Sequence, residues 1–437
     1  MGTIHQEIAG NTEREPLLGT GISGEEAILA RWGKTVKKIK LAQLEGSWGT
    51  AQILGLDAFS WRIDWADVWA FRCIGNNTPL VRITTRGRRT VAVAPSQFCL
   101  TVNDEGKIVV SRPLNLHPGR SLIPLARKIP GPYSLKLPIQ QNLLLKPYGR
   151  RPKYVIEELP LTRNFGFFLG RYLANGSTEN DAAVAIANIH PALTEKIVAA
   201  ATRLGIKPHV SDLRIRISSA QLARILEREF GTGAAKKKIP GWVFGASPAF
   251  RQGLADGYWS HAWISGDGMQ MKACTDSKEL GFDMQALLLS MGIQSSCREW
   301  YYIKKHTPTE LHYIVELAAS SIGRMPLLTH PDRRACQSRW NIPKKDMLCV
   351  APIPRKLVKG RLKAKASKGF GGFSFVNREA SHPQHRKLLE GDLMWDVVES
   401  VEEDLTSRTL CQIQLAGSAT PVLYSGIGLV GHLSMDI

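Results

Sequence analysis

One unit of sequence occurs twice in this chain, and an internal duplication constrains architecture more than any single residue does. Each copy opens with an apolar helix rich in small residues. That helix ends in an oxygen-bearing side chain followed by glycine, Asn175-Gly176 in the first copy and Asp256-Gly257 in the second. The two closing glycines are 81 positions apart (257 − 176). The duplication predicts an α+β domain with pseudo-twofold symmetry.

The segments that follow the two glycines also match in order. A strand-like run, a helix, a Gly-Ile turn and an alternating strand-like run follow Gly176 at 182–189, 191–204, 205–206 and 213–218. The same order, with one more strand-like run, follows Gly257 at 269–274, 277–291, 292–293, 297–303 and 312–317. The two repeats therefore occupy residues 160–230 and 248–320.

The helix that opens the first repeat carries Gly166, Gly170 and Ala174 at four-residue spacing. Small residues at this spacing let two helix backbones approach closely, so the residues that end the paired helices lie side by side. Two carboxylates at the bottom of such a pair are what a divalent metal needs to hold a phosphate and a water in line. The residues that end the two helices here are an amide and a carboxylate, Asn175 and Asp256, which makes them the candidate metal ligands that the resemblance described next implies.

This repeated helix resembles the LAGLIDADG, or DOD-type, motif of homing endonucleases, whose αββαββ unit occurs twice in the single-chain members. The resemblance covers residues 160 to 320. Lys236-Lys237-Lys238-Ile239-Pro240 is similar to a Lys-Ile-Pro run before the second motif, which implies that Lys238 faces the reacting phosphate. Cys274 to Leu280 is similar to the family's strand-to-helix turn. The resemblance implies Mg2+ or Mn2+ as cofactor, double-stranded DNA as partner, and a monomer, because the duplication supplies both halves.

The flanks resemble the Hint-type splicing domain of inteins. The similar segments before the repeats are Gly21 to Leu29, Thr90 to Gln97 and Leu116 to Pro124; those after them are Leu393 to Glu402, Leu410 to Leu415 and Tyr424 to Ser434. An endonuclease inserted between the two parts of a splicing domain is the intein layout. The fold class expected is thus α+β, with a β-rich Hint-like domain formed by both chain ends and a pseudo-twofold LAGLIDADG domain.

The expected division of the chain follows from these resemblances. It comprises a leader or host remnant at 1–20, Hint-like parts at 21–150 and 388–434, a LAGLIDADG-like domain at 155–330, and a basic connector at 331–387. Between residues 331 and 370 there are twelve Lys or Arg against two Asp or Glu, which suits contact with a DNA backbone.

The splicing residues depart from the intein pattern. Splicing needs a nucleophilic thiol or hydroxyl, a histidine that protonates the leaving amide, and an asparagine that cyclises. The matching positions hold Gly21, Gln97 and Leu433, and only His432 and Ser434 remain. Glycine has no nucleophile, glutamine cannot shuttle a proton near neutral pH, and leucine cannot form a succinimide. We therefore predict that self-splicing is lost; a self-processing protein is the alternative.

The endonuclease site is altered as well. Asn175 stands where the family carries an acid, and an amide oxygen is a weaker magnesium ligand than a carboxylate. The second motif admits two alignments. One makes Asp256 the metal ligand, and the other, which has a longer ending, places Ala262 at the position of the metal-binding acid. One surviving acid allows nicking or slow cleavage. Without it, the chain is a non-catalytic DNA-binding relic, which is the alternative to a weakened endonuclease.

Charge favours a nucleic-acid partner. The formal net charge is +19 and the sequence pI is near 9.7, a balance that attracts a polyanion. Six cations in or beside the strand-like runs are the expected DNA contacts: Arg214, Arg216, Lys272, Arg298, Lys304 and Lys305. If the two sheets align as in the family, these residues line a curved β-surface that follows a major groove. A solvated sheet face is the alternative.

Composition also bears on compartment. No apolar run approaches the roughly 20 residues of a membrane span, and the polar N-terminus lacks a signal-peptide core. The seven cysteines are odd in number and never spaced Cys-x-x-Cys, which predicts reduced thiols with neither a disulfide framework nor a zinc knuckle. These features predict a cytoplasmic or nuclear protein that is not secreted and has no membrane partner.

Two smaller groups of residues have no assigned function. Trp61, Trp65 and Trp69 share one face of either a helix or a long strand, and are expected to pack in a core or at a domain junction. His382 and His385 are expected to lie in a surface loop, because a proline separates them and no cysteine or carboxylate is near in sequence.

Overall fold

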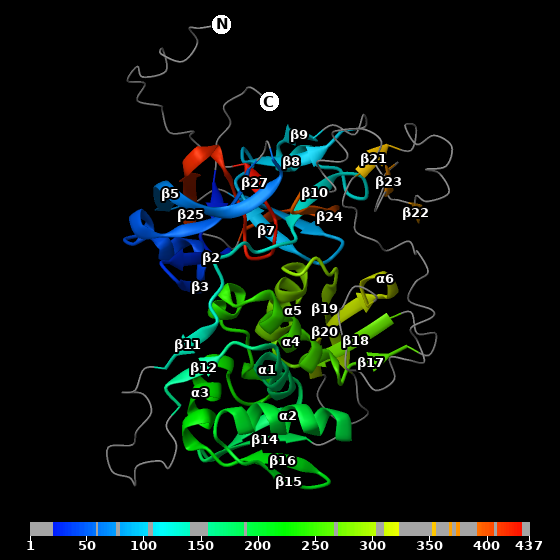
Figure 1. Cartoon of the computed structure of the whole chain (residues 1–437). Helices are drawn as coiled ribbons and strands as arrows, with labels where there is room; N and C mark the ends of the chain where they lie inside the picture. Colours follow the sequence, from blue (N-terminus) through cyan, green and yellow to red (C-terminus); the bar gives the residue numbers. More distant parts are fainter. Residues whose placement is uncertain are drawn as a thin grey trace, which may run out of the picture.

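The computed structural model describes residues 21–57, 60–75, 79–103, 108–139, 156–187, 190–265, 270–302, 310–322, 352–354, 367–368, 373–375, 391–405 and 409–430. Figure 1 shows two bodies, one above the other. The upper body, here the β-rich domain, contains the described residues of 21–126 and 391–430. The lower body, here the two-repeat domain, contains those of 156–322. His382, His385 and nearly all of the expected basic connector lie outside the described residues.

One antiparallel sheet of the β-rich domain takes strands from both ends of the chain. Its order is β10-β24-β6-β7-β1-β25-β5-β4-β2-β3, and β26 pairs with β4. The bounds are β1 Ile22–Ser23, β2 Ala27–Trp32, β3 Thr35–Lys40, β4 Gln52–Asp57, β5 Arg62–Gly75, β6 Leu80–Thr85, β7 Thr90–Val93, β10 Leu122–Ala126, β24 Leu393–Asp404, β25 Thr409–Leu415 and β26 Thr420–Pro421. Ile22 lies opposite Cys411, and Pro124 lies opposite Trp395. As expected from the sequence, both chain ends contribute to one β-rich fold.

Smaller strands and turns lie outside this sheet. β8 (Phe98–Val102) pairs with β9 (Ile108–Ser111) and β27 (Leu429–Val430), and β11 (Lys136–Pro138) pairs with β12 (Glu158–Pro160). A three-stranded sheet consists of β21 Pro352–Pro354, β22 Ser367–Lys368 and β23 Phe373–Phe375. Short 3-10 turns are η1 Leu41–Leu44, η2 Trp48–Thr50, η3 Pro113–Asn115 and η8 Ala416–Ser418.

A bulge in β5 separates the three tryptophans that were expected to share a face. Trp65 is buried, and its indole nitrogen donates to Pro130 O at 3.3 Å. The register against β25 shifts so that Leu415 faces Val68 while Gln414 faces Ala70. Trp69 is therefore the extra residue, and it is 72% exposed. The expectation of a core position is wrong for Trp69, because the bulged residue is left unpaired in the strand ladder and its side chain stays in solvent.

Two of the seven cysteines form a disulfide. Cys73 on β5 and Cys411 on β25 lie opposite each other in the sheet and are bonded. The prediction of reduced thiols is wrong for this pair, because sheet register brings together residues that are far apart in sequence. Cys99, Cys274 and Cys297 are free, and Cys336 and Cys349 lie outside the described residues.

The two-repeat domain has the same element order twice. The first repeat consists of α1 Arg163–Asn175, β13 Gly176–Glu179, β14 Ala183–Ala187, α2 Pro191–Arg203, β15 His209–Val210, β16 Arg214–Ile217 and α3 Ala220–Phe230. The second consists of α4 Pro248–Trp259, β17 Trp263–Ile264, β18 Gln270–Thr275, α5 Lys278–Leu289, β19 Ser296–Tyr302, β20 Glu310–Ala318 and α6 Ala319–Ile322. The turns η5 (Ala234–Lys236) and η6 (Gly241–Gly245) join them. The sheets also correspond, since their orders are β13-β14-β16-β15 and β17-β18-β20-β19.

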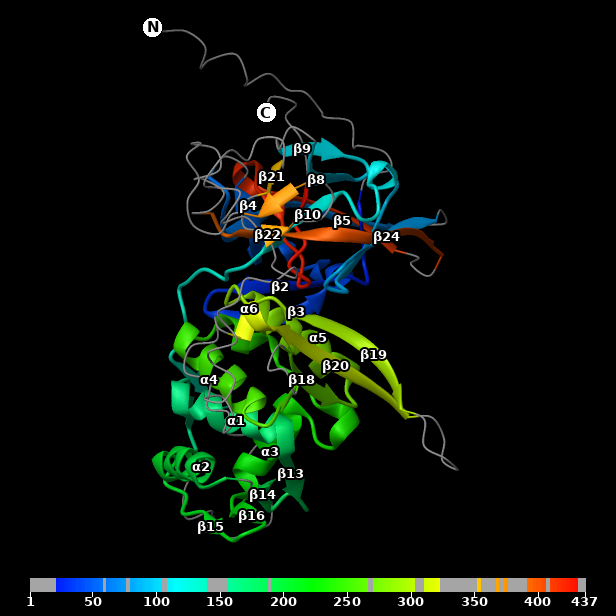
Figure 2. The same ribbon diagram turned by 90° about the vertical axis from the view of Figure 1, so that its right-hand side faces the viewer.

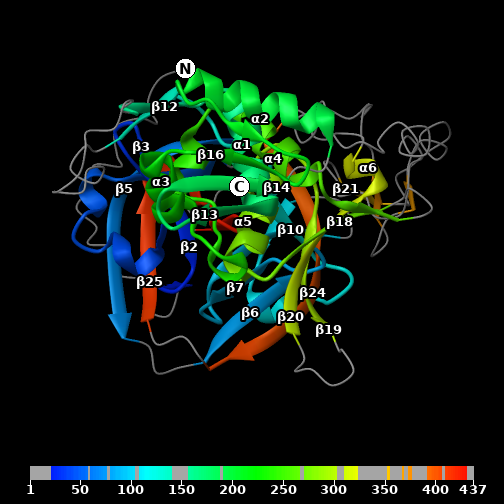
Figure 3. The same ribbon diagram turned by 90° about the horizontal axis from the view of Figure 1, so that it is seen from below.

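Local sequence explains where these helices begin. The hydroxyls of Thr162, Ser219, Ser247 and Ser277 each accept a hydrogen bond from the backbone N–H three residues later, so each caps a helix N-terminus. Figures 2 and 3 show α1 and α4 packed together near the middle of the domain, with the two four-stranded sheets around them. In the described part of the chain, no helix combines the length and apolarity that crossing a membrane requires.

Candidate nucleic-acid interface

Helices α1 and α4 pack backbone to backbone along four glycines. A Cβ added at Gly170 would overlap the carbonyl oxygen of Leu254, and one added at Gly257 would overlap that of Phe167. Gly166 and Gly253 have the same relation to the carbonyl oxygens of Phe250 and Arg163, respectively. Both glycine pairs are related by a shift of 87 positions (253 − 166 and 257 − 170). This reciprocity defines which residues of the two repeats are equivalent.

The shift of 87 corrects the expected metal ligands. It makes Ala262 the equivalent of Asn175 and Asp256 the equivalent of Leu169. Asn175 is the last residue of α1, whereas Asp256 lies inside α4 with 2% of its surface exposed. The expected pairing of Asn175 with Asp256 is wrong, because Gly257 packs as the counterpart of Gly170 and not of Gly176. The structure thus favours the alignment that puts Ala262 in place of the second acid.

A lysine occupies the C-terminal end of α1. The ammonium group of Lys237 donates to the carbonyl oxygens of Tyr172 (2.8 Å), Leu173 (3.0 Å) and Gly176 (2.8 Å). These bonds use all three donors of the ammonium group, on two carbonyls in the last turn of α1 and one carbonyl of β13. Burial lowers the pKa of Lys237 to about 8. Sequence reasoning missed this residue because nothing in a run of three lysines shows which one is buried.

The residues at the base of the helix pair do not fit Mg2+ or Mn2+. These ions need several oxygen ligands, usually with carboxylates among them. The Oδ1 atom of Asn175 is buried with no hydrogen-bond partner among the described residues, so Asn175 provides one neutral oxygen as a potential ligand. Ala262 offers no side-chain oxygen, and the Lys237 ammonium on the neighbouring carbonyls repels a second cation. Within the described ranges, no three His, Cys, Asp or Glu residues are grouped to hold a metal.

The first splicing position leaves little room for a side chain. A Cβ at Gly21 would lie 2.7 Å from Leu410 Cγ and 3.0 Å from Cys411 O, so β25 leaves little room for a side chain there. Gln97 is buried and its amide donates to Phe98 O at 3.1 Å. His432, Leu433 and Ser434 lie outside the described residues.

The expected DNA contacts of the first sheet share one acidic partner. Arg214 and Arg216 lie on the same face of β16 and bond the two carboxylate oxygens of Glu179 at 2.8 and 2.7 Å. Both arginines remain accessible, with 58% and 39% of their side chains exposed. The pair and its glutamate therefore leave a net charge of +1 on this face.

The second sheet repeats the arrangement. Lys272 on β18 and Arg298 on β19 lie 3.8 and 3.6 Å from the same carboxylate oxygen of Glu316 on β20. Each face therefore has two cations around one glutamate, although the two arginines share β16 whereas Lys272 and Arg298 lie on the two strands that flank β20. Lys304 and Lys305 lie outside the described residues.

A buried carboxylate connects the two domains. Lys38 on β3 lies 2.7 Å from Asp283 and 2.7 Å from Glu279, both on α5. Asp283 also accepts hydrogen bonds from the backbone N–H of Ile239 and from the Tyr424 hydroxyl, both at 2.8 Å. Burial raises the pKa of Asp283, and these three donors oppose that shift. The network holds the segment around Ile239, and with it Lys237, against the β-rich domain.

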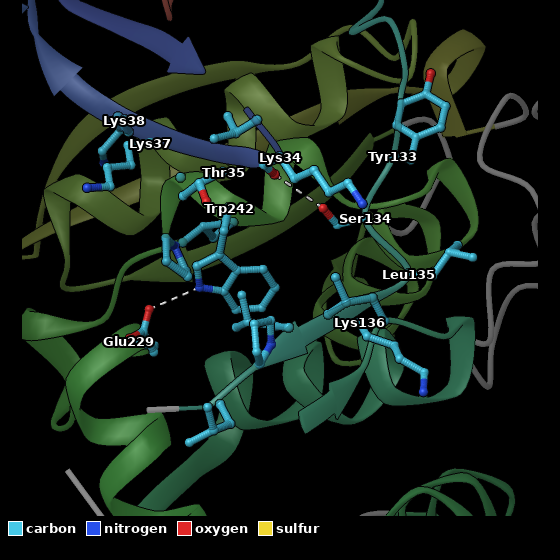
Figure 4. Close-up of a pocket in the computed structure, with 18 of the residues that line it drawn as sticks. Lys34, Thr35, Lys37, Lys38, Tyr133, Ser134, Leu135, Lys136, Glu229 and Trp242 are labelled. Atoms are coloured by element: carbon cyan, nitrogen blue, oxygen red, sulfur yellow. Dashed lines mark hydrogen bonds between the residues drawn. The ribbon is translucent and has the colours of Figure 1, made fainter. Parts of the chain in front are cut away.

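A groove of about 1170 Å3 opens beside this contact. β3, residues 132–139 and residues 238–242 line it. Figure 4 shows Lys34, Lys37 and Lys136 around the groove, with the Trp242 indole donating to Glu229 at 3.0 Å. Lys238 lines the groove and is partly exposed. Lys237, and not Lys238, thus contacts the end of α1.

Comparisons with known proteins add the following. No family model matches this chain. The curated DNA-directed RNA polymerase subunit Rpo1C of Methanocaldococcus jannaschii is 25% identical over 373 residues, which cover 75% of this chain and 43% of that subunit. The chain thus spans less than half the length of the curated relative that it matches.

Among solved structures, the chain is similar to inteins over about a quarter of its length. The transcription factor IIB Mvu mini-intein is 18% identical, with 26% of this chain and 72% of that chain covered and a TM-score of 0.23. A DnaB intein from Synechocystis sp. PCC 6803 is 20% identical, with 25% and 70% covered and a TM-score of 0.21.

Proposed function

We propose that this chain is an intein-derived, LAGLIDADG-type protein that binds duplex DNA and neither cuts it nor splices itself. The observation that carries the proposal is the pair of matching sheets around the glycine-packed helices, each with two cations and one glutamate on its outer face. Cations on the open face of a sheet suit the phosphates that border a major groove. The net charge of +19 adds a long-range attraction for the same polyanion.

The glutamate on each face competes with DNA phosphates for the cations. Glu179 and Glu316 each hold two cations, so phosphates must compete with a carboxylate for them. We therefore expect moderate affinity with a strong dependence on salt, because each neutralised phosphate contributes about −0.9 to the slope of log K against log salt.

Loss of cleavage follows from the base of the helix pair. Asn175, Ala262 and the Lys237 ammonium replace the two acids that would hold a metal, and Asp256 is buried within α4. Loss of splicing follows from Gly21, which has no nucleophile and little space for one. A weakened endonuclease and a self-processing protein remain the two alternatives.

The test compares binding and cleavage on the same DNA. The wild-type chain is mixed with a labelled pool of random duplexes at several KCl concentrations, with Mg2+ or Mn2+. We expect salt-sensitive retardation of the duplex, uncut DNA, and an intact mass for the expressed chain. Nicked or linear product that Asp256→Ala abolishes would establish an endonuclease instead.

A second variant tests the reason for the loss. Asn175→Asp with Ala262→Asp places two carboxylates at equivalent helix ends, and we expect it to bind Mn2+ in calorimetry where the wild type does not. Leu169→Asp with the natural Asp256 is the matched control, because it also gives two equivalent acids, but inside the helices. If the wild type binds Mn2+ as tightly as the first variant does, the account of this site is wrong.

A further inference from the structure

The outer face of the second sheet carries a group of aromatic rings that the function proposed above does not use. Trp300 and Tyr302 alternate on β19, and His312 on β20 lies directly opposite Trp300. The ring centroid of Trp300 lies 5.4 Å from that of Tyr302 and 6.0 Å from that of His312. Trp300 is 41% exposed and Tyr302 is 39% exposed, although both are large apolar rings.

A further exposed ring and two cations lie on the same face. Trp263 on β17 is 58% exposed and lies opposite Lys272 in the sheet, whose ammonium is 5.6 Å from the centre of the indole. Lys272 and Arg298 both lie within ion-pair distance of Glu316, so the two cations lie between Trp263 and the rings of Trp300, Tyr302 and His312. The opposite face of this sheet buries Tyr313, Val315 and Leu317, so the core is complete without these rings.

The first sheet has a different surface at the corresponding place. Its outer face carries Ser177, Ala185 and Ala187 beside the two arginines, and β15, the counterpart of β19, adds one ring, that of His209 opposite Arg216. Small side chains let a sheet approach the grooves of an intact duplex, whereas projecting indole rings present flat apolar surfaces that unpaired bases cover. The two faces therefore have the same charges and differ in their rings.

We propose that the outer face of the second sheet binds single-stranded nucleic acid, with unpaired bases stacked on Trp300, Tyr302 and Trp263 and phosphates on Lys272 and Arg298. Exposed aromatic rings interleaved with cations on an antiparallel sheet are the combination that holds single strands with little sequence preference. The inference goes beyond the binding of duplex DNA and does not depend on it, because unpaired bases are absent from a duplex.

The experiment measures the affinity of the full chain for fluorescein-labelled oligo(dT) and for a duplex of equal length. The test variant is Trp300→Ala with Tyr302→Ala, which removes two stacking rings. Trp69→Ala is the matched control, because Trp69 is an exposed tryptophan on β5 of the β-rich domain. Trp300→Phe with Tyr302→Phe keeps two flat rings and serves as the rescue variant.

We expect the test variant to bind oligo(dT) at least about 10-fold more weakly, since stacking on one ring contributes about that much. The control and rescue variants should bind as the wild type does, and duplex affinity should change by less than about twofold. Equal binding of oligo(dT) by the test variant and the wild type would overturn the proposal, and would leave the rings a role only in stabilising the pairing of β19 with β20. If the duplex is not bound while oligo(dT) still is, the duplex-binding function fails and this inference stands.

Discussion

A single methyl group placed between α1 and α4 should separate them. Gly170→Ala puts a Cβ atom onto the carbonyl oxygen of Leu254, and the next nearest atom is the backbone nitrogen of Tyr258 at 2.7 Å. Both atoms belong to the backbone of α4, so they move only if the helix moves. The two helices must therefore part along their buried contact.

The size of the effect follows from two opposing contributions. Overpacking of a tight core typically costs 1–3 kcal/mol, and contact with rigid backbone places this site at about 3 kcal/mol. Alanine returns about 1 kcal/mol through its higher helix propensity. The net loss is about 2 kcal/mol, which lowers the melting temperature of a domain of this size by about 4–8 °C.

Gly281→Ala is the matched control in the thermal unfolding assay. Gly281 is also helical, in α5, but its added Cβ would meet side-chain atoms, Cys297 Sγ at 3.0 Å and Tyr313 Cβ at 3.2 Å. We expect this variant to melt within about 3 °C of the wild type, because side chains can adjust and the gain in propensity is the same. If the Gly170→Ala variant melts at the same temperature as the Gly281→Ala variant, the close approach of α1 and α4 is refuted. The shift of 87 positions that relates the two repeats is then refuted as well.

Three further predictions concern charged groups. Glu179→Gln frees its two arginines for phosphates, so the slope of log K against log KCl for a duplex should steepen by up to about 1; an unchanged slope would show that these arginines do not contact DNA. Burial raises the pKa of Glu26 to about 7 from an unfolded value of 4.5, so the folded state binds more protons between these values and the free energy of unfolding falls as the pH rises from 4.5 to 7. In melting curves recorded across this pH range, Glu26→Gln should lack the fall, whereas Glu25→Gln should keep it. Burial lowers the pKa of Lys237 to about 8 from 10.5, so the unfolded state binds more protons between these values and the free energy of unfolding rises with pH from 8 to 10.5. Lys237→Met should lack this rise, and Lys236→Met should keep it. Identical pH profiles of stability for the two variants would contradict the burial of Lys237.

Local signals in the sequence predicted much of the two-repeat domain. Local apolar patterns predicted the helices, and the structure adds the hydroxyl caps of Thr162 and Ser277, which fix where two of them begin. The order of elements after each helix was visible for the same reason, since each segment carries its own pattern. The prediction that both chain ends form a β-rich part also agrees with the sheet, where β25 lies between β1 and β5.

Positions that depend on packing between distant segments could not be predicted in this way. Asp256-Gly257 looks like Asn175-Gly176 in sequence, yet helix packing aligns Gly257 with Gly170. The choice between Lys237 and Lys238 depends on where η5 and η6 lie relative to the end of α1. Trp69 depends on a one-residue shift in register against a strand from the other end of the chain.

The bond between Cys73 and Cys411 gives the polypeptide the topology of a ring with two tails. It joins positions separated by 338 residues, and the whole two-repeat domain lies within the ring. One cut in the backbone anywhere inside this ring opens it without releasing a fragment, so the two halves of the β-rich domain stay covalently joined until the bond is reduced. We therefore expect the two outer parts to stay linked when the central part is interrupted, because this link does not pass through that part.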